Sequence, residues 1–165
     1  MLGEHRNNAR RERGDMSNEC VFCRIAARRI NAYVVHEDER LVAFLDREPI
    51  RTGHIQIAPR DHFRCFDEAP AEIVCSIVLL GQRIAVALKK LYGVPRVAFL
   101  FTGSDIPHLH AHVVPMHEKT DITSRRYIAE DRVTFRVIPE VAASELARTA
   151  DEVRHALTDA GSSQT

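Results

Sequence analysis

The chain has 165 residues, which is long enough for one domain with its own hydrophobic core and short for two. Lysine and arginine together number 23, and aspartate and glutamate also number 23, so the formal net charge is 0. This balance excludes a general electrostatic attraction to nucleic acid or to anionic membranes, and any phosphate must be held locally. No apolar run approaches the ~20 residues that span a bilayer, and the polar N-terminus lacks the apolar segment of a signal peptide. We therefore expect a cytoplasmic protein that binds neither nucleic acid nor membrane.

The N-terminal segment differs in composition from the rest of the chain. Residues 1–16 contain four arginines and three acidic residues with almost no apolar side chains, so they bury too little surface to offset the entropy of ordering. We predict a disordered tail over 1–16, a single domain over 17–160 and a frayed C-terminus over 161–165. Met16 is an alternative start of the natural chain, and the upstream residues are then an extension.

Three short apolar segments in the first half of the domain have the composition of β-strands. They follow a short apolar turn around Phe22 and Ile25. Each is bounded by charged or turn-forming residues, and the segments are Ala32–His36, Leu41–Leu45 and His54–Ala58. The charged residues 37–40 between the first two strands predict a hairpin.

The period of the apolar residues changes after Pro70. Their spacing is now three and four positions, which is typical of an amphipathic helix, and the stripe consists of Ile73, Ile77, Leu80, Ile84, Leu88 and Leu91. Pro70 suits the first turn of this helix, and Gly93 suits its end.

The second half of the domain adds strands and a second helix. Strands are expected over Arg96–Phe101 and Leu109–Val114, with a weaker one over Val133–Ile138. A C-terminal helix is expected after Pro139 or Ser144, with one face formed by Ala142, Leu146, Ala150, Val153 and Leu157. Strands that bracket one long helix predict an α+β domain with a mainly antiparallel sheet and a C-terminal helix.

The four cysteines need an explanation other than disulfides, because the cytoplasm keeps thiols reduced. Cys20 and Cys23 have the spacing that lets two thiolates reach one metal ion. Cys65 and Cys75 stand alone, and we expect them to be small buried apolar residues.

Three histidines alternate along the segment 106–115. Successive side chains of a strand point to opposite faces, so His108, His110 and His112 share one face at spacings of about 7 Å, and the residues between them face the core. Two histidines could be chance surface residues or part of a metal-affinity tag. Three histidines at strict alternation are explained less readily in either way. A zinc site made from all three is disfavoured, because neighbours on a flat strand converge poorly on a tetrahedral ion. A nucleophile with supporting neighbours fits better.

With this segment the chain resembles the histidine triad (HIT) family, whose signature is His-x-His-x-His followed by apolar residues. Three further segments fall in the family's order and spacing: Cys20–Ile25, Val42–Asp46 and Gly53–His62. The resemblance covers residues 19–117 and implies the HIT-like α+β fold.

The resemblance implies a nucleotide hydrolase or transferase that acts at the alpha-phosphorus of a purine nucleotide derivative, either a nucleoside phosphoramidate or a dinucleoside polyphosphate. The middle histidine, His110, is the implied nucleophile and forms a nucleotidyl-histidine intermediate. It needs one ring nitrogen that donates to a backbone carbonyl, so that the other keeps its lone pair. His112 is placed to donate to the phosphate oxygens, and His54 resembles the family's fourth histidine.

The resemblance also implies a nucleotide pocket and a zinc site. Asp46 matches the carboxylate that accepts hydrogen bonds from the two ribose hydroxyls. The apolar walls of the base pocket are matched by Phe22, Ile25 and Phe44, for which ordinary core packing is an equally good interpretation. Zinc-binding members complete a tetrahedron with two cysteines and two histidines, which implies a closed structural Zn²⁺ site of Cys20, Cys23, His62 and His108.

The chain departs from the family just ahead of the triad, where many members carry an asparagine and a later glutamine that help to hold the phosphate and the leaving group. The corresponding segment, Phe101–Pro107, is shorter and lacks the glutamine. Thr102 or Ser104 is a candidate donor to the nucleotide in their place, as are His117 and Lys119 beyond the triad. The departure leaves open an alternative function, a nucleotide-binding or scaffold protein with negligible turnover. For either function the resemblance implies a homodimer.

Overall fold

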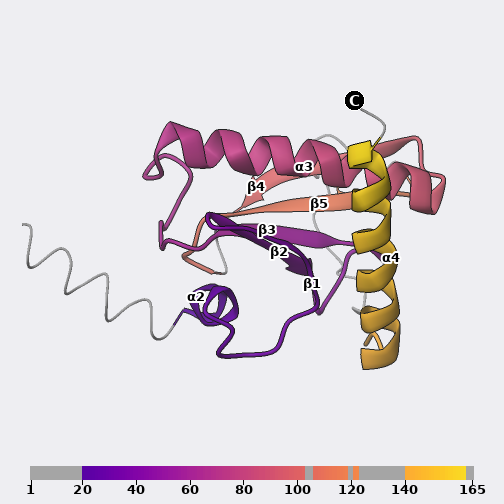
Figure 1. Ribbon diagram of the computed structural model, residues 1–165, viewed down its shortest axis with the longest axis horizontal. Coiled ribbons are helices and arrows are strands. Elements are labelled where there is room, and N and C mark those ends of the chain that lie inside the picture. The colour runs from indigo at the N-terminus through magenta and orange to yellow at the C-terminus, as the bar shows by residue number, and fades with distance from the viewer. Residues whose placement is uncertain (1–19, 103–105, 119–120, 123–139, 163–165) are drawn as a thin grey trace, which may run out of the picture.

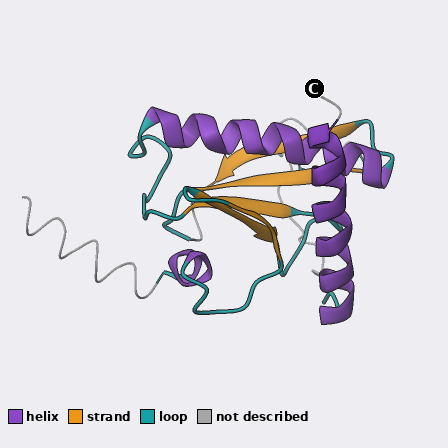
Figure 2. Cartoon of the chain, viewed as in Figure 1, coloured by secondary structure: helices purple, strands orange, loops and turns teal. Residues whose placement is uncertain are grey.

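The structure combines an antiparallel sheet with helices on both of its faces. It is a computed structural model that describes residues 20–102, 106–118, 121–122 and 140–162. Its helices are α2 (Val21–Ala26), α3 (Ala71–Tyr92) and α4 (Ala143–Ser162), and its strands are β1 (Val34–Glu37), β2 (Leu41–Leu45), β3 (Ile55–Pro59), β4 (Arg96–Thr102) and β5 (His110–Met116). The described strands lie in the order β1-β2-β3-β5-β4 and every neighbouring pair is antiparallel (Figure 1 and Figure 2). The α+β class predicted from the sequence is confirmed.

The two faces of the sheet have different coverings. On one face, alternate strand residues pack with α3 and α4 into the main core, which includes Leu41, Ala43, Ile55, Ile57, Ala111 and Val113. Figure 1 shows α3 along this side of the sheet and α2 on the opposite side. A smaller apolar cluster joins α2 to the second face through Phe22, Ile25, Val42, Phe44 and Ala58. The histidines of β5 lie on this second face, because they alternate with core residues.

Helix α3 follows the predicted apolar stripe. It begins after Pro70 and ends at Gly93, which adopts the left-handed conformation (φ 62°) that favours glycine. Its buried residues include Ile77, Leu80, Ile84 and Leu88 of the predicted face. Gly81 lies against the ring of Phe99 in β4, at a position where a Cβ atom would collide with that ring. The missing side chain therefore lets α3 and β4 approach closely.

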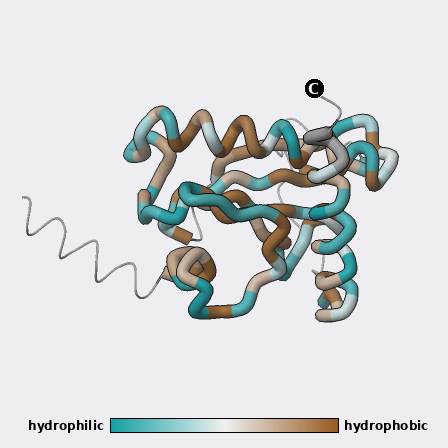
Figure 3. Tube along the Cα trace, viewed as in Figure 1, coloured by the Kyte–Doolittle hydropathy of each residue, from teal (hydrophilic) through white to brown (hydrophobic). Residues whose placement is uncertain are grey.

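The expectation that no apolar run approaches a membrane-spanning length is wrong for α3. By length and composition alone, its 22 residues are apolar enough to cross a bilayer, with a mean hydropathy of 1.8 over its most apolar part, and Figure 3 shows these apolar stretches. Core helices of soluble proteins pass the same test. One side of α3 packs into the core, while the outer side exposes Val78, Leu79 and Val86. The cytoplasmic location and the absence of nucleic-acid and membrane binding stay predictions.

Helix α2 differs from its predicted form, because the sequence analysis expected only a turn around Phe22 and Ile25. These residues and Ala26 lie on one face at helical spacing and pack against Phe44 of β2 and its neighbours. Six residues are too few to show a helical period or to be stable alone. The helix is therefore a product of its packing on the sheet.

The remaining predicted elements are found close to their expected positions. The predicted hairpin joins β1 to β2. Helix α4 begins next to Ser144, one of the two predicted starts, and extends to Ser162, into the segment where fraying was predicted. The predicted tail over 1–16 and the predicted strand over Val133–Ile138 lie outside the described residues.

The two lone cysteines are exposed, which corrects the prediction that they are buried apolar residues. Cys75 lies on α3 two positions from both Ile73 and Ile77, and therefore on the side of the helix opposite the buried stripe. Cys65 lies in the loop between β3 and α3, where its Sγ is 4.0 Å from a carboxylate oxygen of Glu68.

Candidate functional site

Two cysteines and two histidines from separate parts of the chain meet beside α2, and we call them the Cys/His cluster. Cys20 precedes α2 and Cys23 lies within it, whereas His62 follows β3 and His108 precedes β5. The Sγ of Cys20 lies 3.3 Å from His108 Nδ1, and the Sγ of Cys23 lies 3.2 Å from His62 Nδ1. All four possible ligand atoms lie within 4.8 Å of one another. The structure thus brings together the four residues predicted to bind zinc.

The donor atoms of the Cys/His cluster fit a zinc ion, which two thiolates and two imidazole nitrogens bind tetrahedrally. His108 is fully buried, and its Nε2–H donates to the Pro59 carbonyl oxygen at 3.0 Å, so Nδ1 keeps its lone pair toward the thiols. Burial lowers the pKa of His108 to about 4 and keeps the ring neutral. Burial and the neighbouring Cys20 raise the pKa of the Cys23 thiol to about 12. A metal ion that binds here must therefore displace the thiol proton of Cys23.

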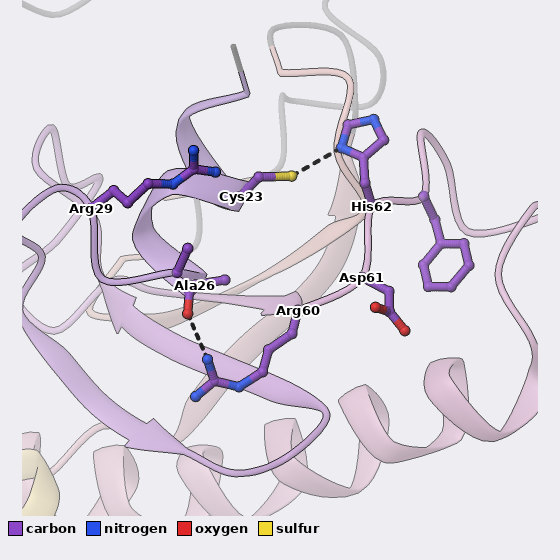
Figure 4. Close-up of a pocket in the computed structure, with 8 residues that line it drawn as sticks. Cys23, Ala26, Arg29, Arg60, Asp61 and His62 are labelled. Carbon is purple, nitrogen blue, oxygen red and sulfur yellow. Dashed lines mark hydrogen bonds between the residues drawn. The ribbon is translucent and has the colours of Figure 1, made fainter. Parts of the chain in front are cut away.

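A pocket adjoins the Cys/His cluster between α2 and the loop after β3. Figure 4 shows His62 turned toward Cys23 across this region. Arg60, which lines the pocket, donates to the carbonyl oxygens of Ala26 and Asp38, both at 2.6 Å. These two bonds tie α2 and the β1–β2 hairpin to the end of β3, so the cysteines of α2 are held next to the histidines.

The middle histidine of the triad has one ring nitrogen fixed and one available. His110 on β5 is 4% exposed, and its Nδ1–H donates to the His108 carbonyl oxygen at 2.6 Å. This bond leaves the lone pair on Nε2, which is the arrangement that a histidine nucleophile requires. The ring meets the Phe22 ring edge-on, with centroids 5.0 Å apart. Helix α2 therefore also restrains the orientation of His110.

The third histidine belongs to a chain of polar contacts across neighbouring strands. Its Nδ1 lies 2.8 Å from Nε2 of His54, and Nε2 of His112 lies 2.7 Å from the hydroxyl oxygen of Thr102. Nδ1 of His54 lies 3.3 Å from the backbone nitrogen of Ile50 and 3.5 Å from a carboxylate oxygen of Asp46. Burial lowers the pKa of His54 to about 4, against the opposing effect of Asp46. His54 is therefore neutral near pH 7, and the chain holds the ring of His112 from both sides.

A single cavity is lined by four of the five residues predicted to bind the nucleotide: Phe22, Ile25, Phe44 and Asp46. The rings of Phe22 and Phe44 meet edge to face, with centroids 5.3 Å apart. The three apolar residues also pack in the cluster that joins α2 to the sheet, so they belong both to the core and to the cavity wall. The fifth residue, Ser104, lies outside the described residues.

The cavity has further walls that the sequence analysis did not identify. They include Gln56 on β3, Ile106 ahead of the triad, and Leu146 on α4. The signal in the sequence was a glutamine between Ile55 and Ile57 in a predicted strand. No local pattern in the sequence indicated that α4 would line the cavity, because this helix is distant in sequence from the motifs.

Two other residues were candidate donors to the nucleotide. His117 lies against Tyr92 at the end of α3, with ring centroids 6.3 Å apart. Lys119 lies outside the described residues. Among the described residues of the segment ahead of the triad, the side chain of Thr102 lies 2.7 Å from Nε2 of His112, and the backbone oxygen of Ile106 accepts the N–H of His108 at 2.7 Å.

The family model of the HIT domain matches residues 27–119. The chain belongs to the HIT family. An uncharacterized HIT-like protein of Methanocaldococcus jannaschii is 35% identical over 60% of this chain and 80% of its own length. The crystal structure of a Zn-bound histidine triad family protein from Mycobacterium smegmatis matches this HIT protein with a TM-score of 0.71 and 26% identity, over 90% of this chain and 99% of that one.

A third relative carries a named activity. An adenylylsulfatase of Arabidopsis thaliana is 28% identical over 66% of this chain. The match covers 57% of the Arabidopsis protein, so this HIT protein corresponds to little more than half of it. Membership of the family establishes a HIT fold and a nucleotide-binding class.

Proposed function

We propose that this HIT protein is a hydrolase or transferase that acts at the alpha-phosphorus of a purine nucleotide derivative, either a nucleoside phosphoramidate or a dinucleoside polyphosphate. The hydrogen bond from His110 Nδ1 to the His108 carbonyl carries the proposal, because it leaves Nε2 as a nucleophile on the sheet face where α2 and the cavity lie. The similarity to the Arabidopsis adenylylsulfatase supports a substrate with a nucleotidyl group.

The reaction has two steps. In the first, Nε2 of His110 attacks the alpha-phosphorus and forms a P–N bond, while the bond to the leaving group breaks and its electron pair departs with that group. The Nδ1–H bond to the backbone oxygen stabilises the positive charge that develops on the ring. In the second step water or another acceptor attacks phosphorus, loses its proton to the solvent, and the P–N electron pair returns to Nε2. The products are the free nucleotide, or its adduct, and the regenerated histidine.

The residues around His110 bind and orient the substrate. Asp46 accepts a hydrogen bond from the ribose, and the apolar side chains of the cavity hold the base. When the substrate binds, the Nε2–H of His112 turns from the Thr102 hydroxyl to the phosphate oxygens, while the contact of Nδ1 with His54 keeps the ring oriented. Of the candidate donors named from the sequence, we propose Thr102 in place of the asparagine, because its hydroxyl lies beside His112.

We further propose that the Cys/His cluster holds one structural zinc ion. Its four donor atoms and the fixed His108 ring support this assignment, as does the Zn-bound relative from Mycobacterium smegmatis. The ion, when bound, supplies a cross-link between α2, the loop after β3 and the start of β5. His108 then serves as a metal ligand and leaves the chemistry to His110.

The shortened segment ahead of the triad supports a second candidate function, nucleotide binding with negligible turnover. A substrate screen separates the two candidates. The full-length, zinc-loaded protein is incubated with adenosine and guanosine phosphoramidates, dinucleoside polyphosphates and adenylyl sulfate, and the release of AMP or GMP is followed by chromatography. We expect release from at least one substrate, together with a nucleotidyl adduct of the protein in acid-free quenched samples analysed by mass spectrometry. Binding of AMP without release from any substrate would favour the second function, and no binding of nucleotide contradicts both.

We propose that the protein is a homodimer, because its exposed apolar residues adjoin an edge of the described sheet. Val78, Leu79 and Val86 lie on the outer side of α3, and Phe99 lies on β4, the last strand in the described order. An apolar helix face next to a strand edge that no other described strand pairs with is suited to self-association, which buries both.

The dimer is tested by light scattering at micromolar concentration. We expect twice the chain mass of 18.7 kDa for the native protein and a mass near one chain for Leu79→Glu, which places a charge in the apolar face. Ile50→Glu, at an exposed apolar residue elsewhere, is the matched control and should stay dimeric. A native mass of one chain contradicts the proposal.

A further inference from the structure

Gln56 is a polar residue in a strand that is otherwise apolar. All five residues of β3 are buried, and Gln56 is only 9% exposed. It lies between the Cα partners Phe44 of β2 and His112 of β5. Its side chain is therefore on the face of the sheet that carries the triad, and it lines the cavity of the proposed nucleotide site.

The hydrogen bonds of Asp46 determine how the Gln56 amide is oriented. A carboxylate only accepts hydrogen bonds, so the amide atom 2.5 Å from Asp46 Oδ2 must be the donor Nε2. The other amide atom, Oε1, is buried and has no hydrogen-bond partner among the described groups. Exchange of the two atoms would place two acceptors together, so the network itself excludes the flipped form.

A buried acceptor without a partner destabilises a folded protein, and such groups are rare unless a ligand or water completes them. Gln56 shares its cavity with Asp46, whose Oδ1 already accepts the N–H of Glu48 at 2.8 Å. The carboxylate thus has a bond at each oxygen before any ligand arrives. The adjacent Oε1 of Gln56 accepts no hydrogen bond from a described group, so both of its lone pairs are available to a ligand.

We propose that Gln56 is a specificity-determining residue of the nucleotide site, whose Oε1 accepts a hydrogen bond from one ribose hydroxyl while Asp46 accepts from the other. The inference rests on the proposed function, because it assigns the ribose to the Asp46 end of the cavity. A cis-diol offers two O–H donors on neighbouring carbons, and the linked amide and carboxylate offer two acceptors side by side. The site therefore selects ribonucleotides over nucleotides that lack one hydroxyl.

The test compares the dissociation constants of AMP, 2′-deoxy-AMP and 3′-deoxy-AMP by calorimetry on the zinc-loaded, full-length protein. In the native protein we expect each deoxy analogue to bind ~10-fold to ~100-fold more weakly than AMP, as when a buried acceptor loses its donor. Gln56→Met keeps the length of the side chain and removes both polar atoms. We expect this variant to lose most of the discrimination for one of the two analogues and to retain it for the other.

A matched control is Gln82→Met, the same substitution at an exposed glutamine of α3 outside the cavity, which should leave both ratios unchanged. Gln56→Asn, which withdraws the amide by one methylene, is the second variant if Gln56→Met does not fold, and should lose the same discrimination. Equal binding of all three nucleotides to the native protein overturns the inference, as do unchanged ratios in a folded Gln56 variant. Either result leaves the proposed function standing, whereas failure of AMP itself to bind contradicts the proposed function.

Discussion

His110→Ala should abolish phosphorus chemistry on every substrate that the native protein turns over. The variant lacks the Nε2 lone pair and with it the two-step covalent route, so we expect kcat to fall by at least ~10⁴-fold. Nucleotide affinity should change by less than ~10-fold, because the proposed contacts of the base and ribose come from other residues of the cavity. The measurements are turnover of the best substrate and calorimetric binding of AMP.

The matched control for His110→Ala is His155→Ala, at an exposed histidine on α4 whose Nδ1–H donates to the Asp151 carbonyl oxygen. This control should keep native turnover. The nucleotidyl adduct seen by mass spectrometry in the native protein should be absent from His110→Ala and present in the control. Near-native turnover by His110→Ala would show that His110 is not the nucleophile.

Removal of the metal should produce the largest change in stability. Cys20 and Cys23 anchor the region of α2, while His62 and His108 belong to the sheet side of the same cluster, so a bound ion contributes directly to folding stability. We expect about one zinc per chain by elemental analysis. A strong chelator, or the variant Cys20→Ser, should cost at least ~3 kcal/mol and lower the melting temperature by roughly 10 °C in a chain of this size.

Cys75→Ser is the matched control for Cys20→Ser, because Cys75 is an exposed cysteine on α3 far from the cluster in sequence. Its melting temperature should equal that of the native protein, both before and after treatment with the chelator. If the purified protein carries no zinc and chelator leaves the melting temperature unchanged, the structural zinc assignment is wrong. His108 would then be free to act in the chemistry.

Much of the fold was predictable because its signals are periodic and local. The stripe of α3 follows helical spacing over 22 residues, and the alternation around His110 is that of a half-buried strand. The Cys/His cluster was predictable only through resemblance to a family, since Cys20 and His108 lie 88 residues apart. No local pattern relates residues at that separation.

The features that the sequence did not predict depend on packing between distant elements. Helix α2 is too short for a period and forms against β2. The exposure of Cys75, in contrast, follows from helical spacing alone, because this residue lies opposite the predicted stripe of α3. The unpartnered oxygen of Gln56 exists only because Asp46 occupies the other end of the amide. Such a feature is a property of the assembled site and of no single segment.

His108 contributes two different groups to two different sites. Its imidazole belongs to the Cys/His cluster, and its backbone oxygen holds the ring of His110. The cluster therefore fixes the residue whose backbone oxygen orients the nucleophile. A rotation of this peptide plane would turn Nε2 of His110 away from the substrate. Another metal-binding side chain at position 108 would leave the hydrogen bond to His110 in place, because its acceptor is the main-chain oxygen. The orientation of His110 thus depends on the path of the backbone at position 108 and not on the identity of the side chain there.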